Sequence, residues 1–260
     1  MSSYNGRKAF DIFTPHHCFI EGHRGMNKLE PENTLDSYKH SIEAGLDGIE
    51  LDIWLTKDKI PVVIHGKDDG DISATTNGKG RVKEMTLSEL RQYKTLNGNK
   101  DIPMLEEVLK LCKNKIFLNI ELKDPDIKET FAQVIKLIET YDMINQIAFS
   151  SFKHEYAEEV KKYKKDIEFG YLYQSQKDKK KFIPYNFEVS HCSMNIYGED
   201  INKEMVDKIH SKGNTVMCWF GVKDAENEEI YRKIFDLGVE VLCCNEPDKV
   251  LAFRNKYYNK

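Results

Sequence analysis

Side chains able to carry out acid–base and metal chemistry follow short apolar runs in the first quarter of the chain. The set comprises two histidines, one arginine and two carboxylates: His23, Arg24, Glu50, Asp52 and His65. Carboxylates hold divalent cations, arginine binds phosphate, and imidazoles transfer protons near neutral pH. These residue types in this order predict metal-assisted attack on a phosphate ester.

Two pairs of charged residues repeat the same strand spacing. Glu50 and Asp52 are two residues apart, so in a strand both side chains project from one face. Glu121 and Lys123 repeat this arrangement later in the chain. Buried carboxylates are costly unless a cation or a basic partner neutralises them, and a lysine beside them could reach a phosphate oxygen. An ordinary ion pair within a strand would explain one such arrangement of charged residues. Two such arrangements on successive strands favour a metal site.

The remaining candidates are weighed by their position at strand ends. His23 and His65 each end a strand beside the carboxylates, and the other six histidines lack this context. His191 lies inside a predicted strand and could line the site or be a hydrogen-bonded core residue. Arg24 could bind phosphate or orient the carboxylates of the next strand. Trp219 also ends a strand, where its ring could contact an alcohol or choline-like group or pack in the core.

Strand and helix signals alternate along the chain and indicate the elements that position these groups. Strands are expected at 18–21, 48–55 with 61–65, 116–122, 146–150, 167–173, 188–194, 215–220 and 240–244. Helices are expected at 35–45, 85–93, 104–112, 126–141, 154–163, 203–210, 225–235 and 247–258. With 48–65 counted as one strand region, eight strand–helix units result, which predicts an α/β protein with one (β/α)8 TIM-barrel domain over residues 1–260.

Two local features qualify this pattern. Asn33 precedes the first helical run, with Asp36 three residues later, and is expected to be its N-cap. Residues 66–101 form an insertion too long and polar for an ordinary loop. This insertion could be a lid or substrate wall over the catalytic face, or a surface insertion without a role in the site.

Composition narrows the class of protein and of partner. The 260-residue chain is 40% apolar with a formal net charge of −4, which disfavours nucleic acid as the main partner. No apolar run approaches a membrane span, and the first residues lack the apolar stretch of a secretory signal. Six cysteines show no C-x-x-C spacing, so reduced thiols are expected. We therefore expect a cytoplasmic protein without stable membrane insertion.

The chain resembles the glycerophosphodiester phosphodiesterase family at motifs that run in order along nearly its whole length. The matching motifs are His23-Arg24-Gly25, Pro31-Glu32-Asn33-Thr34, Gly48-Ile49-Glu50-Leu51-Asp52, His65, Thr75-Thr76-Asn77-Gly78, Ile102-Pro103-Met104-Leu105-Glu106-Glu107, Glu121-Leu122-Lys123 and Trp219. The resemblance implies a TIM barrel that hydrolyses small glycerophosphodiesters, such as glycerophosphocholine, to glycerol 3-phosphate and an alcohol with Mg²⁺ or Ca²⁺. It also implies roles for individual residues: metal ligands Glu50, Asp52 and Glu121; general acid and base His23 and His65; phosphate-binding Arg24 and Lys123.

Three departures from the family pattern bear on substrate preference, because none removes a proposed catalytic group. Gly66 follows His65 where the family usually has Asp, Cys244-Asn245 replaces Thr-Asp, and Phe220 follows Trp219 where a small polar residue is common. Two other functions stay open: a lysophospholipase D-like enzyme acting on lysophospholipids, and a non-catalytic phosphodiester-binding protein of the same fold. The nucleophile could be water or the glycerol 2-hydroxyl, which would give a cyclic phosphate.

Overall fold

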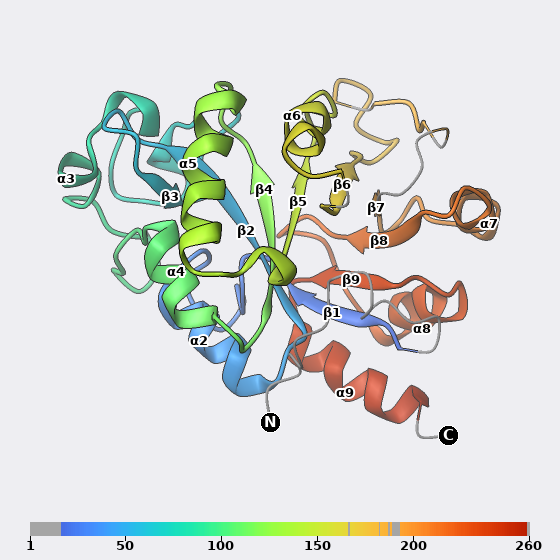
Figure 1. Ribbon diagram of the computed structural model, residues 1–260. Helices are drawn as coiled ribbons and strands as arrows, with labels where there is room; N and C mark the ends of the chain where they lie inside the picture. The colour runs from blue at the N-terminus through green and yellow to red at the C-terminus, as the bar shows by residue number, and fades with distance from the viewer. Residues whose placement is uncertain (1–16, 166, 182, 187, 189–192, 259–260) are drawn as a thin grey trace.

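Eight parallel strands close into a barrel within the part of the chain that the computed structural model describes, residues 17–165, 167–181, 183–186, 188 and 193–258 (Figure 1). They are β1 (Phe19–Gly22), β2 (Gly48–Leu55), β4 (Phe117–Leu122), β5 (Ile147–Ser151), β6 (Phe169–Leu172), β7 (Ser193–Tyr197), β8 (Thr215–Trp219) and β9 (Val241–Cys244). The order around the barrel is β1-β9-β8-β7-β6-β5-β4-β2, and pairing of β1 with β2 closes it. The predicted α/β TIM barrel is therefore confirmed.

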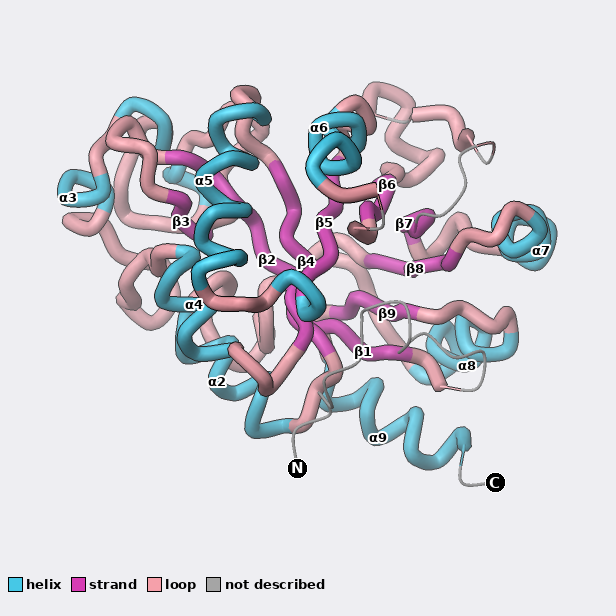
Figure 2. Tube along the Cα trace, in the orientation of Figure 1, coloured by secondary structure: helices cyan, strands magenta, loops and turns pink. Residues whose placement is uncertain are grey.

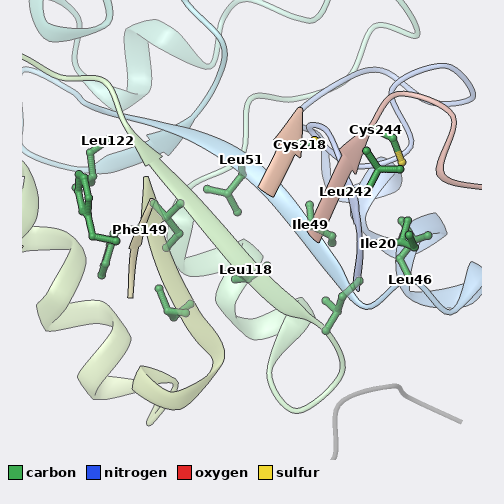
Figure 3. Packing of buried hydrophobic residues seen from close by; sticks show 14 of the residues in the cluster. Ile20, Leu46, Ile49, Leu51, Leu118, Leu122, Phe149, Cys218, Leu242 and Cys244 are labelled. Carbon is green, nitrogen blue, oxygen red and sulfur yellow. The ribbon is translucent and has the colours of Figure 1, made fainter. Parts of the chain in front are cut away.

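Helices cover the outside of this barrel, as the tube in Figure 2 shows. They are α2 (Leu35–Ala44), α4 (Leu105–Cys112), α5 (Ile127–Thr140), α6 (Tyr156–Tyr163), α7 (Lys203–Ser211), α8 (Glu228–Asp236) and α9 (Pro247–Tyr258). Alternate strand residues such as Leu51, Leu118 and Phe149 point outward and pack in the main core, seen at close range in Figure 3. This alternation leaves the other face of each strand free to line the barrel interior.

The barrel interior changes character along its axis. Toward the amino ends of the strands, the interior is filled by an apolar cluster of inward-facing residues: Phe19, Phe117, Met217, Val241 and Cys243. Two residues further along β4 from Phe117 comes Asn119, and two further comes Glu121. The polar part of the interior therefore lies toward the carboxyl ends of the strands, which is where TIM barrels carry their active sites.

The region 48–65 is a hairpin rather than one strand region. β3 (Pro61–Val63) pairs antiparallel with β2, with Val63 opposite Ile53, and lies outside the eight parallel strands. The turn between them includes Lys59 with φ +63°. The backbone N–H of Ile64 then donates to the carbonyl of Asp52 at 3.1 Å. The hairpin thus returns the chain to the level of the β2 carboxylates, just before His65.

Residues 66–101 fold back over this hairpin in short turns. They contain two 3₁₀ turns, η1 (Ile72–Ala74) and η2 (Val82–Glu84), and the four-residue helix α3 (Leu87–Leu90). The prediction of a helix over 85–93 is wrong in extent, because this segment is shaped by packing into a second small core. That core consists of Trp54, Val62, Ile64, Ile72, Val82, Leu90 and Ile102.

Other differences from the predicted elements are small. The strand expected at 188–194 is observed as β7 from Ser193, and His191 and Cys192 lie outside the described residues. The five described cysteines are buried and carry free thiols. Among the described helices, none combines the length and apolar character needed to cross a membrane.

A buried ion pair joins the last helix to the strands where the barrel closes. Asp47, just before β2, accepts hydrogen bonds from the Arg254 guanidinium of α9 and from the backbone N–H of Ile20 (2.9 Å). Arg254 also donates to the carbonyl of Cys18 at 3.1 Å. Because both side chains are about nine-tenths buried, neither charge can be solvated if its partner is lost.

Substitution Arg254→Met is expected to lower the free energy of unfolding by about 3 kcal/mol, because it leaves the Asp47 carboxylate buried without its cation. Urea unfolding followed by circular dichroism measures this loss. Lys256→Met, which alters an exposed lysine on the same helix, serves as the control and should change stability little. Equal losses in the two variants would contradict the role given to this ion pair.

Candidate active site

One cavity of about 250 Å³ opens at the carboxyl ends of the strands. Seven of the eight predicted site residues line it: His23, Arg24, Glu50, His65, Glu121, Lys123 and Trp219. The eighth, Asp52, is fully buried and contacts the side chain of Lys123 at 3.2 Å. The structure therefore brings all eight predicted residues together, from the three strands β2, β4 and β8 and from the loops after β1, β3 and β4.

Three carboxylates form the acidic centre of the site. Glu50, Asp52 and Glu121 each present an oxygen within 4.8 Å of the others, because Asp52 and Glu121 are opposite one another on β2 and β4. Burial and neighbouring carboxylates raise the pKa of Glu50, and burial raises the pKa of Glu121 to about 7. The Oε1 atom of Glu50 is buried without a hydrogen-bond partner. A set of hard oxygen donors with an unsatisfied atom fits a divalent cation.

Asp52 is kept ionised by its surroundings. Burial alone would raise its pKa, but the cations of Lys123 and Arg24 hold it below the usual range. The Nδ2 atom of Asn33 donates to Asp52 Oδ2 at 2.8 Å. Asn33 is therefore not the N-cap of α2; that position belongs to Thr34, whose Oγ1 accepts from the backbone of Ser37 at 3.3 Å.

Arg24 orients the carboxylates while also lining the cavity. Its backbone N–H donates to Glu50 Oε2 at 3.1 Å, and its φ of +56° directs that N–H toward β2. Its guanidinium contacts Glu32 Oε1 at 2.9 Å and Asp52 Oδ2 at 3.4 Å. Arg24 was expected either to bind phosphate or to orient the carboxylates of the next strand, and the structure shows the contacts for the second role.

Lys123 provides the second cation of the site. Its Nζ lies 3.0 Å from Glu121 Oε1 and 3.2 Å from Asp52 Oδ1, so it bridges the two strands. These contacts outweigh the effect of burial and raise its pKa. A permanently charged ammonium at the cavity wall can contact an anionic substrate.

The two histidines are neutral in their present surroundings. Burial lowers the pKa of both His23 and His65 to about 3, and the Arg24 cation contributes in each case. His23 Nδ1 lies 3.0 Å from Asn245 Oδ1, and its Nε2 lies 3.9 Å from Glu50 Oε2. His65 reaches the cavity through the β2–β3 hairpin, not from the end of a barrel strand.

An aromatic wall faces the carboxylates across the cavity. Trp219 meets Phe152 and Tyr197 edge-on, with ring centroids 5.5 and 5.3 Å apart, and its Nε1 donates to the carbonyl of Tyr173 at 3.1 Å. The next residue, Phe220, points into the main core. The departure at Phe220 therefore does not change the cavity.

The segment after His65 supplies a cavity residue that was not among the eight predicted site residues. Asp68 lines the cavity and pairs with Lys181 at 2.9 Å. It is carried on a tight turn in which the N–H of Gly70 donates to the carbonyl of Lys67 at 2.8 Å. A Cβ atom on Gly66 would lie 2.9 Å from Gly70 Cα, so this turn requires glycine at position 66. The turn thus places a carboxylate in the cavity lining two residues after position 66.

Asn33 and Asn245 were also missed as site residues. Asn33 was visible in the Pro31-Glu32-Asn33-Thr34 motif but was interpreted by its local capping pattern. Asn245 was visible only as a departure near the end of the chain. Each contacts a site residue far away in sequence, 19 residues for Asp52 and 222 for His23, which local patterns do not reveal.

The acidic, histidine-lined cavity at the carboxyl ends of the parallel strands places the chain in the class of α/β barrels with an active site at that end. The model of the glycerophosphoryl diester phosphodiesterase family matches residues 23–249. A glycerophosphodiester phosphodiesterase of Caldanaerobacter subterraneus is 32% identical over 91% of this chain and 98% of its own length. The chain therefore belongs to the glycerophosphoryl diester phosphodiesterase family, and it is an enzyme of this class.

Solved structures agree with the fold. The glycerophosphodiester phosphodiesterase of Thermotoga maritima superposes with a TM-score of 0.70 at 26% identity, covering 91% of this chain and 98% of that one. A structure from Silicibacter pomeroyi superposes with a TM-score of 0.81 at 21% identity over 94% and 95% of the two chains, which supports the fold alone.

The family-typical residue at position 66 is expected to impair this chain. Gly66→Asp forces its Cβ against the backbone of Gly70, so the turn carrying Asp68 must shift at a cost of about 1–3 kcal/mol. We expect a lower melting temperature and a lower kcat/KM toward glycerophosphodiesters. Lys83→Ala, on an exposed residue of the same segment, is the control and should leave both unchanged. Unchanged or improved activity in Gly66→Asp would show that the turn does not depend on glycine.

Proposed function

We propose that this chain hydrolyses glycerophosphodiesters, such as glycerophosphocholine, to glycerol 3-phosphate and an alcohol with the help of a divalent cation. The observation that carries the proposal is the single cavity in which two neutral imidazoles, His23 and His65, flank a buried carboxylate centre. Neutral imidazoles can accept protons, and acid–base catalysis of phosphodiester cleavage needs one proton acceptor and one donor.

Glu50, Asp52 and Glu121 would hold the cation, Mg²⁺ or Ca²⁺. The unsatisfied Oε1 atom of Glu50 and the raised pKa values of Glu50 and Glu121 support this assignment, because a cation would neutralise the carboxylates that burial now disfavours. When bound, the cation supplies charge neutralisation at the nonbridging phosphate oxygens.

The two histidines divide the proton transfers in this proposal. One accepts a proton from the nucleophile, and the other, once protonated, donates to the departing alkoxide. Water and the glycerol 2-hydroxyl are both suitable nucleophiles; attack by the hydroxyl gives a cyclic phosphate that water then opens. Lys123 and Arg24 provide positive charge at the cavity wall for the phosphate.

The cavity lining favours a small, water-soluble substrate. Besides the aromatic wall, its rim carries the polar side chains of Asp68, Gln174 and Lys181. The acyl chain of a lysophospholipid would need an apolar entrance to bury its methylene groups. This polar rim supports the glycerophosphodiester over the lysophospholipase D-like alternative.

Release of glycerol 3-phosphate from glycerophosphocholine by the purified protein tests the proposal. With Mg²⁺ or Ca²⁺ we expect turnover that EDTA abolishes, and His23→Ala or His65→Ala should each lower kcat by about 10²-fold or more. His40→Ala is the matched control, since His40 is partly exposed on α2 and contacts only Glu30 among the described acidic groups.

Other outcomes would assign a different function. Turnover of lysophosphatidylcholine without turnover of glycerophosphocholine would establish the lysophospholipase D-like activity. Binding of glycerophosphocholine without turnover of either substrate would indicate a non-catalytic binding protein. A cyclic phosphate detected by ³¹P NMR in quenched reactions would identify the 2-hydroxyl as the nucleophile, and its absence throughout the reaction would favour water.

A further inference from the structure

Glu226 lies in the loop before α8, outside the cavity lining, and its carboxylate holds Asn245 in place. Its Oε1 accepts from the backbone N–H of Asn245 at 2.8 Å and from Asn245 Nδ2 at 2.7 Å. Asn245 Nδ2 also donates to the carbonyl of Gly221 at 3.0 Å. The hydroxyl of Tyr231 donates to the other oxygen of Glu226 at 3.3 Å. An ionised carboxylate and a backbone carbonyl can only accept, so they fix which end of the Asn245 amide is the NH₂ group.

The opposite end of that amide is consequently an acceptor facing His23. Asn245 Oδ1 lies 3.0 Å from His23 Nδ1 and accepts from Asn27 Nδ2 at 2.8 Å. The orientation of Asn27 is fixed independently, because the same Nδ2 donates to the carbonyl of His23 at 2.8 Å. His23 Nδ1 must therefore be the donor in its contact with Asn245, and a neutral His23 must carry its proton there.

We propose that Glu226 is a positioning residue which, through Asn245, selects the Nδ1–H tautomer of His23. Nε2 is then left unprotonated on the side of the ring that lies 3.9 Å from Glu50 Oε2 in the cavity. His23 consequently enters the reaction as the proton acceptor. The proton of the nucleophile's hydroxyl passes to Nε2 as its oxygen bonds to phosphorus, and Nδ1–H keeps its hydrogen bond to Asn245. The bond between phosphorus and the alcohol oxygen breaks, and the other histidine, once protonated, gives its proton to the departing alkoxide. This inference rests on the proposed function for its catalytic consequence, but not for the tautomer itself.

The tautomer of His23 depends on Glu226 because the side-chain amide of Asn245 can adopt two orientations. Asn245 is 1% exposed, so its amide groups must find partners within the protein. With Glu226 in place, a flipped amide would set Oδ1 against a carboxylate and a carbonyl, which is repulsive. Without Glu226 the flip is opposed, among the described residues, only by the Gly221 carbonyl and by Asn27 Nδ2, so it becomes more accessible. The flipped amide would present an N–H group to His23 Nδ1 and favour the opposite tautomer.

¹⁵N NMR of the full-length protein labelled at histidine nitrogens tests the tautomer directly, without metal or substrate. In the wild type we expect the His23 signals, assigned by their loss in His23→Ala, to show a protonated Nδ1 and an unprotonated Nε2. Glu226→Ala should give a mixture of tautomers. Glu226→Gln keeps an oxygen that can accept both N–H groups, so it should retain the wild-type pattern. Glu229→Ala, on an exposed glutamate three residues away, should also retain it.

Kinetics with glycerophosphocholine should follow the spectra. We expect Glu226→Ala to lower kcat at least about 10-fold with little change in KM, because the hydrogen bond to the outer nitrogen of a catalytic imidazole sets its orientation and tautomer. Glu226→Gln and Glu229→Ala should stay close to the wild type. If Glu226→Ala fails to fold, Asn245→Ala removes the same acceptor from His23 and should shift the tautomer in the same way.

A wild-type spectrum with the proton on Nε2 would overturn the inference. So would identical tautomers in the wild type and in whichever of Glu226→Ala and Asn245→Ala folds. Failure of the wild type to hydrolyse glycerophosphocholine would instead contradict the proposed function, while the tautomer measured without substrate would still stand.

Discussion

The complete burial of the Asp52 charge is the constraint on which the rest of the site depends. An ionised carboxylate without water costs several kcal/mol, so it persists only where nearby groups compensate it. Three do so here: Asn33 from the loop before α2, Arg24 from the loop after β1, and Lys123 at the end of β4. The same groups bring Glu50 and Glu121 into position, since Arg24 also binds Glu50 and Lys123 also binds Glu121. The acidic centre and its basic partners therefore form one network.

Barrel closure brings the residues that follow the first strand, β1, next to those that follow the last strand, β9, at this network. His23 follows β1 and Asn245 follows β9, and these neighbouring strands make the 3.0 Å contact between the two side chains possible. His65 arrives by a different route, because the β2–β3 hairpin turns back onto the level of Asp52. One imidazole is thus held by the closed barrel and the other by a hairpin attached to it.

Much of this could be predicted where the signal is local. The predicted bounds of β2, 48–55, coincide with the observed strand, and its alternation correctly places Glu50 and Asp52 on the inward face. The same alternation identifies the outward-facing residues of β4. These predictions succeed because successive side chains of a strand point to opposite faces. Charged residues two positions apart therefore share one face, and the apolar residues between them share the other.

The features that escaped prediction depend on distant contacts. The direction of β3 is set by its pairing with β2, and a strand pattern does not encode that direction. Asn33 has the sequence context of an N-cap, but its hydrogen bond to Asp52 takes precedence over that local role. Asn245 has no local signal at all, because its function lies in contacts with Glu226 and His23.

Glu50 and Glu121, in the cation site proposed here, differ from Asp52 because burial raises the pKa of both despite the nearby cations of Arg24 and Lys123. Calorimetric titration of Mg²⁺ or Ca²⁺ near pH 6.5, repeated in buffers of different ionisation enthalpy, tests this site most directly. With its pKa raised to about 7, Glu121 is largely protonated at that pH, so cation binding must release protons and must strengthen as the pH rises toward 8. We expect this proton release and a large loss of affinity in Glu121→Gln. Absence of binding, or binding without proton release that Glu121→Gln leaves unchanged, would contradict the proposed cation site.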